Sequence, residues 1–397
     1  MMWPSCRPPR SLSMKPAFGL RRHRDAPART RIALSFSLDC ATPMAATQAD
    51  PALQALMLPF ADGTLAWPGE GALFLRARDG WPLHERALPG LVCEQGFRPD
   101  ADALQRSGFE VRAPDEARYP LVLVLPPRQR GEARALFAAA LARLQPGGVI
   151  VASAANDAGA KSHEADLARI AGPLVSRSKH KCRVFWTRPG AAGGDVALAA
   201  QWRALDSPRP IAGGRFSSRP GVFAWDRIDA ASALLAEHLP GDLHGHAADL
   251  GAGWGYLSVE LLQRCPGITA LDLYEAEARA LELARVNLAP FAGRAALAFH
   301  WHDVTAGLSQ RFDVIVSNPP FHAQGNAARP DIGRRFIAVA ADALKPGGRL
   351  LLVANRHLPY ESVLDASFGS TRLVAQRDGF KIVEAVKAGR TTTGAAR

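Results

Sequence analysis

Short runs of consecutive Val, Leu and Ile residues alternate along this 397-residue chain with stretches of helical apolar spacing. The run YPLVLVLPP at 119–127, for example, precedes GEARALFAAALARL at 131–144, where apolar residues recur at helical intervals. Strands that are apolar at every position are typical of parallel sheets covered by helices on both faces. The pattern therefore predicts an α/β fold with mainly parallel, doubly wound sheets.

The same order of elements occurs twice. FDVIVSNPP at 312–320 resembles the run at 119–127, and LKPGGRLLLVAN at 344–355 resembles LQPGGVIVAS at 144–153. A second stretch of helical spacing, at 333–344, lies between the later two runs. Internal similarity over so long a period indicates two related domains in tandem, each Rossmann-like.

The two copies differ where ligands bind in such folds, at the carboxyl ends of the strands. Asn318 precedes the two prolines of the second copy, whereas Leu125 stands at that place in the first. The second copy also has seven more residues before its Pro-Gly-Gly turn. We expect these residues in a loop within HAQGNAARPDIG, immediately after the aromatic Phe321.

A glycine turn follows a short apolar strand in the second copy. AADLGAGWGYLSVE at 247–260 places Gly251, Gly253 and Gly255 before an amphipathic helix, and glycine lets a backbone approach a ligand closely. For the first copy we find LPGLVCEQGFRPD, which has Gly90 and Gly96 but no glycine cluster. We therefore expect the first domain to be degenerate and the second to hold a cofactor.

Three carboxylates stand at the ends of successive predicted strands of the second copy: Asp249, Glu275 and Asp303. Glu275 is placed to accept both hydroxyls of a ribose, and Asp303 to accept the amino group of an adenine. The turn lacks the G-x-x-G ending of dinucleotide-binding folds, so an adenosyl cofactor without pyrophosphate fits better. Any one of these acids by itself would be a solvated turn residue or a helix cap, but the set of three indicates a site. Trp254 is a candidate to cover the cofactor.

These residues resemble the motifs of class I S-adenosylmethionine-dependent methyltransferases. The chain is more specifically similar to the bacterial ribosomal RNA guanine-N2 methyltransferases of both ribosomal subunits. The likeness lies in the degenerate first copy and in the segments GVFAWDRIDAASALL, SNPPFH, VANRHLPY and FKIVEAVKA. The likeness runs over about 50–390, with Glu275 where many members carry Asp. It implies methyl transfer from S-adenosylmethionine to guanine N2, with 16S RNA favoured and 23S RNA as the alternative. The implied partner is ribosomal RNA or a ribosomal subunit.

The sequence Asn318-Pro319-Pro320-Phe321 suits methylation of an exocyclic amine. Two carbonyl oxygens, from the Asn318 side chain and the Pro319 backbone, would hold the amine in line with the methyl donor. Proline limits the freedom of that backbone, and Phe321 offers a face on which a flipped base stacks. His322 is interpreted as an ordinary loop residue. Alone, Asn-Pro would be a turn.

The net charge of +11 is uneven along the chain. Residues 1–43 carry eight basic and two acidic side chains and no signal-peptide apolar core. We interpret 1–44 as a disordered basic extension or as a start assigned too far upstream, with Met44 as the true start. The domains then follow at 45–205 and 206–397.

The remaining composition excludes several classes of protein. Five scattered cysteines provide no C-x-x-C pair, and no run of 18 apolar residues appears, so we expect no metal site, no membrane span and a cytoplasmic monomer. Basic residues that could contact RNA phosphates, or be an ordinary solvated face, are Arg177, Lys179 and Lys181 in the first domain and Arg329 and Arg334 in the second.

Three other functions stay open. Adenine-N6 and protein glutamine-N5 methylation use the same kind of planar nitrogen, although neither needs a degenerate twin domain. A non-catalytic RNA-binding scaffold is the alternative from another class, and the complete set of Asp249, glycines and Asn318 argues against it.

Overall fold

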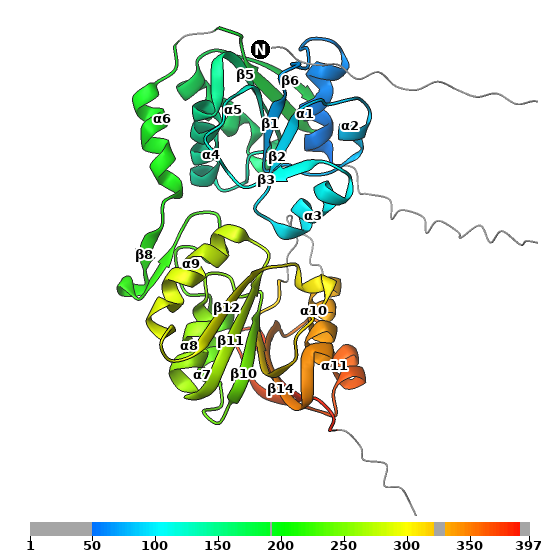
Figure 1. The fold of residues 1–397 in the computed structure, drawn as a ribbon, viewed down its shortest axis with the longest axis vertical. Helices are drawn as coiled ribbons and strands as arrows, with labels where there is room; N and C mark the ends of the chain where they lie inside the picture. Colours follow the sequence, from blue (N-terminus) through cyan, green and yellow to red (C-terminus); the bar gives the residue numbers. More distant parts are fainter. Residues whose placement is uncertain (1–49, 191–192, 321–329, 390–397) are drawn as a thin grey trace, which may run out of the picture. The chain divides into compact units, whose positions relative to one another are not determined.

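The computed structural model describes residues 50–190, 193–320 and 330–389 (Figure 1). The predictions made for residues 1–44, Phe321 and Arg329 lie outside these ranges. Within them the chain forms two seven-stranded sheets and a small two-stranded sheet.

The first large sheet has the strand order β3-β2-β1-β4-β5-β7-β6. All its neighbours pair in parallel except those involving β7, which is antiparallel to both β5 and β6. Its elements are α1 (Pro51–Ala61), β1 (Ala72–Leu75), α2 (Trp81–His84), β2 (Leu91–Glu94), α3 (Arg98–Arg106), β3 (Glu110–Arg112), β4 (Tyr119–Val124), α4 (Arg130–Ala142), β5 (Leu144–Ala155), α5 (Ala160–Ala171), β6 (Leu174–Lys179), β7 (Cys182–Thr187) and α6 (Val196–Arg203).

The second large sheet repeats this order as β12-β11-β10-β13-β14-β16-β15, and β16 is its antiparallel strand. The elements are β8 (Arg209–Ile211), β9 (Phe216–Ser218), α7 (Ala230–Glu237), β10 (His244–Leu250), α8 (Tyr256–Arg264), β11 (Gly267–Glu275), α9 (Ala278–Leu288), β12 (Ala296–Trp301), β13 (Phe312–Ser317), α10 (Pro330–Ala343), β14 (Leu344–Asn355), α11 (Glu361–Ser367), β15 (Ser370–Arg377) and β16 (Phe380–Val386). The tandem repeat predicted from the sequence is therefore confirmed.

Both faces of the second sheet are covered, which explains the continuous apolar strands. Along β13, Val314 and Val316 pack in one core cluster and Ile315 packs in the other. Helices lie on both sides of the sheet (Figure 1). Burying each of these side chains contributes about 1.5–3 kcal/mol, so alternation with polar residues would weaken the sheet.

The predicted helix bounds need correction at their ends. The helix expected at 131–144 begins at Arg130 and ends at Ala142, because Leu144 already starts β5. The helix expected at 333–344 begins at Pro330 and ends at Ala343. Proline is favoured in the first turn of a helix, so residues 330–333 of the predicted loop are helical instead.

The first-half counterpart of the glycine turn lies directly after β1. Leu75 is the last residue of β1, and Leu250 is the last residue of β10. The two residues have the same register with the neighbouring strands of their own sheets. Residues 76–80, RARDG, therefore take the place of residues 251–255, GAGWG. The prediction that LPGLVCEQGFRPD is this counterpart is wrong, since that segment runs through β2 into α3.

At the three key positions the first half has neither the two carboxylates nor the Asn amide of the second half. By register, Phe74, Gln95 and Leu125 stand where the second half has Asp249, Glu275 and Asn318. Arg76 retains the left-handed backbone of its glycine counterpart Gly251, with φ of 53° against 74°. The first half is thus degenerate at each position, as the sequence contrast at Leu125 predicted.

Candidate cofactor and amine site

The glycine turn joins β10 to α8 and lies against the end of β11. The backbone N–H groups of Gly251 and Ala252 both donate to the carbonyl of Tyr274, at 2.9 and 3.1 Å. A Cβ on Gly253 would meet nothing within 4 Å, whereas a Cβ on Gly255 would stand 2.6 Å from Leu288 Cδ1. Gly253 therefore leaves open space above the turn, and Gly255 allows the turn to pack on α9.

Glu275 is tied to the glycine turn by its side chain. Its Oε2 accepts from the Gly253 N–H and its Oε1 from the Glu277 N–H, both at 2.7 Å. Burial raises the pKa of this carboxyl group, although the backbone hydrogen bonds oppose that effect. Glu275 and Gly253 line a cavity of about 590 Å³, large enough for a nucleoside. Each carboxylate oxygen can accept a second hydrogen bond, as a ribose would require.

Asp249 lies beneath the turn rather than in the wall of a cavity. It is fully buried, and its Oδ2 accepts from Ser258 Oγ of α8 at 2.8 Å. Burial raises its pKa to about 7, and the neighbouring charge of Glu275 adds to this. The contact ties β10 to α8, so it fixes the shape of the turn.

Asp303 follows β12, the neighbour of β11 in the sheet. Its Oδ1 accepts from the backbone N–H and the hydroxyl of Thr305, at 2.8 and 2.7 Å, which caps a short 3₁₀ turn. It does not line either of the two cavities around the glycine turn. Its predicted contact with adenine stays a prediction.

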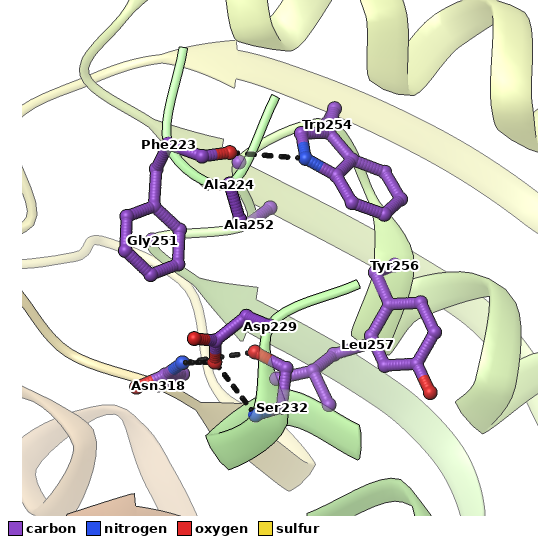
Figure 2. Close-up of a pocket in the computed structure, with 11 residues that line it drawn as sticks. Phe223, Ala224, Asp229, Ser232, Gly251, Ala252, Trp254, Tyr256, Leu257 and Asn318 are labelled. Carbon is purple, nitrogen blue, oxygen red and sulfur yellow. Dashed lines mark hydrogen bonds between the residues drawn. The ribbon is translucent and has the colours of Figure 1, made fainter. Parts of the chain in front are cut away.

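Asn318 lies at the end of β13 and faces the glycine turn. Together with Gly251 and Gly253 it lines a small pocket of about 50 Å³. Its Nδ2 donates to Asp229 Oδ2 at 3.0 Å and to Ser232 Oγ at 2.8 Å, as Figure 2 shows. Its Oδ1 is buried and has no hydrogen-bond partner in the described part of the chain.

The charge of Asp229 decides which way the Asn318 amide points. An ionised carboxylate only accepts hydrogen bonds, so the amide nitrogen must face it and the amide oxygen must face away. Asp229 also accepts from the Ser232 N–H at 2.8 Å, as the N-cap of α7. The result is an amide carbonyl held in one orientation and left free to accept.

The two prolines and their neighbours complete this edge. Pro319 is buried and Pro320 is exposed, so the first is fixed by packing as well as by its ring. Phe321 lies outside the described residues. Phe223, whose ring is 65% exposed, lines both cavities and was not singled out from the sequence, although it lies within GVFAWDRIDAASALL.

Trp254 packs into the core instead of covering an open cleft. Its ring is 4% exposed and stacks at a tilt on Phe216, while its Nε1 donates to the Phe223 carbonyl at 3.1 Å. It lines the small pocket with its neighbours (Figure 2). Its role is thus to anchor the segment that carries Phe223.

Among the predicted RNA contacts, Arg329 lies outside the described residues, and Arg177, Lys179, Lys181 and Arg334 line neither cavity of this site. Arg177 is engaged within the first half, with its guanidinium bonded to Asp62 and lying over the Trp186 ring. Lys179 and Lys181 are exposed at the β6–β7 hairpin. In the second half, Arg334 Nε donates to the Pro359 carbonyl at 3.5 Å.

The described residues lack two kinds of feature. None of their helices combines the length and apolar character needed to cross a bilayer. Across 50–190, 193–320 and 330–389, no group of three or more His, Cys, Asp and Glu side chains is arranged to hold a metal ion.

The strand order, the glycine turn and the acid bonded to it define a class I methyltransferase fold. A family model described as the Methyltransferase small domain matches residues 213–384. The chain is 35% identical over 292 residues to the ribosomal RNA small subunit methyltransferase C of Pseudomonas aeruginosa (strain UCBPP-PA14), covering 72% of this chain and 84% of the relative. The chain belongs to the ribosomal RNA small subunit methyltransferase C family.

The chain is also similar to a solved structure and to a methyltransferase of the other ribosomal subunit. The T. thermophilus 16S ribosomal RNA N2 methyltransferase, solved in complex with AdoMet and guanosine, superposes with a TM-score of 0.70 at 25% identity, covering 85% of this chain and 92% of that one. The ribosomal RNA large subunit methyltransferase G of Alcanivorax borkumensis is 38% identical over 170 residues, which is 42% of this chain and 43% of the relative.

Proposed function

We propose that this protein transfers a methyl group from S-adenosylmethionine to the exocyclic N2 of a guanine in 16S ribosomal RNA. The activities of the similar proteins support the substrate and the cofactor. The observation that carries the chemistry is the Oδ1 atom of Asn318, a buried acceptor without a partner in the described residues, beside the glycine turn.

The residues around the turn fit an adenosyl cofactor. Gly251 and Gly253 let the backbone approach the ligand, and Glu275 would accept from the ribose hydroxyls. Asp303 would bind the adenine amino group, and Gly255 and Asp249 hold the turn to α9 and α8. The cofactor, when bound, supplies an electrophilic methyl group on a sulfonium.

The chain then has to make a poor nucleophile react. The lone pair of a guanine amine is delocalised into the ring, so the amine must be oriented and its developing positive charge stabilised. Asn318 Oδ1 accepts one N–H, and the carbonyl of Pro319 accepts the other. Pro320 stiffens the turn, and Phe321 stacks on the flipped base. The amine becomes acidic as it is alkylated, so no side chain with a pKa near 7 has to remove its proton first.

The first half would guide the RNA. It keeps the fold but lacks two of the three turn glycines and the carboxylates of a cofactor site. Exposed Lys179 and Lys181 suit phosphate contacts, with Arg329 and Arg334 as candidates in the second half and Arg177 as the weakest because of its internal bonds. We place the protein in the cytoplasm, as a monomer, with the first domain at 45–205 and the second at 206–397.

Replacing Asn318 by Ala tests the proposed chemistry. We expect an unchanged dissociation constant for S-adenosylmethionine and a methylation rate lower by roughly 100-fold or more, because an acceptor used in the transition state is lost. A rate within a few-fold of wild type would exclude the role of Asn318. Mass mapping of 16S and 23S RNA from a deletion strain identifies the substrate: a missing methylguanine in 23S RNA would assign the protein to the large subunit instead.

A further inference from the structure

The loop after β11, which directly follows Glu275, is hydrogen-bonded to a loop of the first half. Arg98 N–H donates to the Ala276 carbonyl at 2.8 Å, and Ala278 N–H donates to the Gly96 carbonyl at 2.9 Å. These bonds form an antiparallel bridge between Phe97 and Glu277. The paired segments follow β2 and β11, which hold the same place in the two sheets. The pairing therefore joins equivalent loops of the two repeats.

A tryptophan side chain reinforces this pairing. Trp301 Nε1 lies 2.9 Å from the Gly96 carbonyl and 2.8 Å from the Ala276 carbonyl, so one donor is shared between both loops. The Arg98 guanidinium lies over the Trp301 ring at 4.8 Å. The loop after β11 is thus held by groups from both repeats.

An ion network centred on one buried carboxylate runs through the same region. Glu132 of α4 is 5% exposed and accepts from Arg76 Nη1 at 2.7 Å, while its Oε1 lies 2.8 Å from Arg279 Nη2. Arg279 Nε in turn donates to Glu277 Oε1 at 3.0 Å. The Glu277 N–H donates to Glu275 at 2.7 Å. A continuous line of contacts therefore connects the first half to the acid at the glycine turn.

We propose that Glu132 and Arg279 are positioning residues through which the first half sets the affinity for the cofactor. They hold the loop after β11 so that Glu275 presents its oxygens toward the cavity beside Gly253. This inference rests on the proposed function, in which Glu275 binds the cofactor ribose. Neither Glu132 nor Arg279 takes part in the chemistry itself.

Loss of one member would rearrange the network and so move the loop. Without the charge of the buried Glu132, the Arg279 guanidinium keeps Glu277 and Asp206 as carboxylate partners and shifts toward them. Arg279 would then pull on the side chain of Glu277, and the backbone N–H of Glu277 is the group that holds Glu275. A displacement of Glu275 weakens ribose binding without altering Asn318.

Glu132→Gln keeps the size of the side chain and removes its charge. We expect the dissociation constant for S-adenosylmethionine, measured by calorimetry on the full chain, to rise roughly 3- to 30-fold. At saturating cofactor the turnover rate should stay within about twofold of wild type, since bound molecules keep the same reacting groups. A change in KM for the cofactor without a change in kcat separates positioning from catalysis.

The second half contains a matched control. Glu384 is 6% exposed and pairs with two arginines, Arg349 and Arg372, much as Glu132 pairs with Arg76 and Arg279. Glu384→Gln should lower thermal stability as Glu132→Gln does, yet leave cofactor affinity unchanged.

Two outcomes overturn the inference while the proposed function stands. One is a wild-type affinity in Glu132→Gln; the other is an equal loss of affinity in Glu384→Gln, which would indicate general destabilisation. Wild-type protein that binds no S-adenosylmethionine would overturn the proposed function and this inference with it. Arg279→Lys keeps the charge but not the planar fork, and it should also raise the dissociation constant. It provides the same test if Glu132→Gln does not fold.

Discussion

Asp229 and Asn318 are 89 residues apart in the sequence, and a hydrogen bond of 3.0 Å joins their side chains. Asp229 is the N-cap of α7, and Asn318 directly follows the central strand β13. The acid therefore does two things: it caps a helix and fixes an amide. From the second role we expect Asp229 to affect the methylation rate as well as stability.

Asp229→Ala should lower the methylation rate by roughly 10- to 100-fold at saturating cofactor, because the Asn318 amide becomes free to rotate away from the reacting amine. It should also cost about 1 kcal/mol of stability through the lost cap. Asp195 caps α6 in the same way, through Leu198 N–H at 2.8 Å, far from the glycine turn in the fold. Asp195→Ala should show the loss of stability without the loss of methylation rate. An equal rate loss in both variants would show that Asp229 acts only as a helix cap.

Two glycines of the turn should respond differently to alanine. Gly255→Ala places a Cβ against Leu288 and Ala284 and should reduce the free energy of unfolding by roughly 1–3 kcal/mol. Gly253→Ala meets no atom within 4 Å, so its cost is the left-handed backbone, about 1–2 kcal/mol. Because Gly253 faces the open cavity, its variant should lose cofactor affinity. Denaturant titration and calorimetry on both variants distinguish the two effects, and unaltered binding by Gly253→Ala would contradict the proposed approach of the cofactor.

Asp249 should make stability depend on pH. Burial raises its pKa to about 7, so the folded chain holds a proton that the unfolded chain releases near pH 4. Its contribution to stability is present below about pH 4 and is lost as the pH rises through about 7. The loss amounts to something on the order of 4 kcal/mol.

Asp249→Asn removes this titration while keeping an oxygen that can accept from Ser258. The variant should therefore gain stability relative to wild type between pH 5 and pH 8, in urea unfolding without cofactor. Parallel pH profiles for the two proteins would show that the carboxyl group does not titrate in this range.

Lys179 and Lys181 should contribute to RNA affinity more than Arg177. Replacing both lysines by alanine should weaken binding of ribosomal RNA and lower the slope of log affinity against log salt by about 1.5, if each contacts one phosphate. Arg177→Ala serves as the comparison, because its guanidinium is already bonded to Asp62. An unchanged salt slope in the double variant would show that these two lysines do not contact the RNA.

Much of the fold could be predicted from the sequence because the strands are apolar at every position and the chain repeats itself. The proximity of Asn318 to the glycine turn could be predicted, because both follow adjacent strands of a parallel sheet. The role of Asp229 could not be predicted, because an acid before a helix is usually an ordinary cap. Its contact with Asn318 forms only when the folded chain brings the two residues together. The turn at 76–80 was missed for another reason: only the last of its glycines survives.

The equivalence of Asp249 and Phe74 could not be predicted from the sequence either. A buried aromatic in an apolar strand carries no sign that its counterpart is polar, so sequence similarity between the halves fades where their functions differ. The register of the strands recovers the equivalence, because backbone hydrogen bonds preserve the sheet when side chains do not.

Arg76 occupies the place of a glycine and keeps its left-handed backbone, yet it is also a partner of the buried Glu132. Changing it to glycine would not restore a ligand site without further changes at Arg78 and Gln95, and it would remove one of the two arginines that pair with Glu132. Arg76 of the first repeat shares this carboxylate with Arg279 of the second, so a return to glycine would disturb both repeats at once.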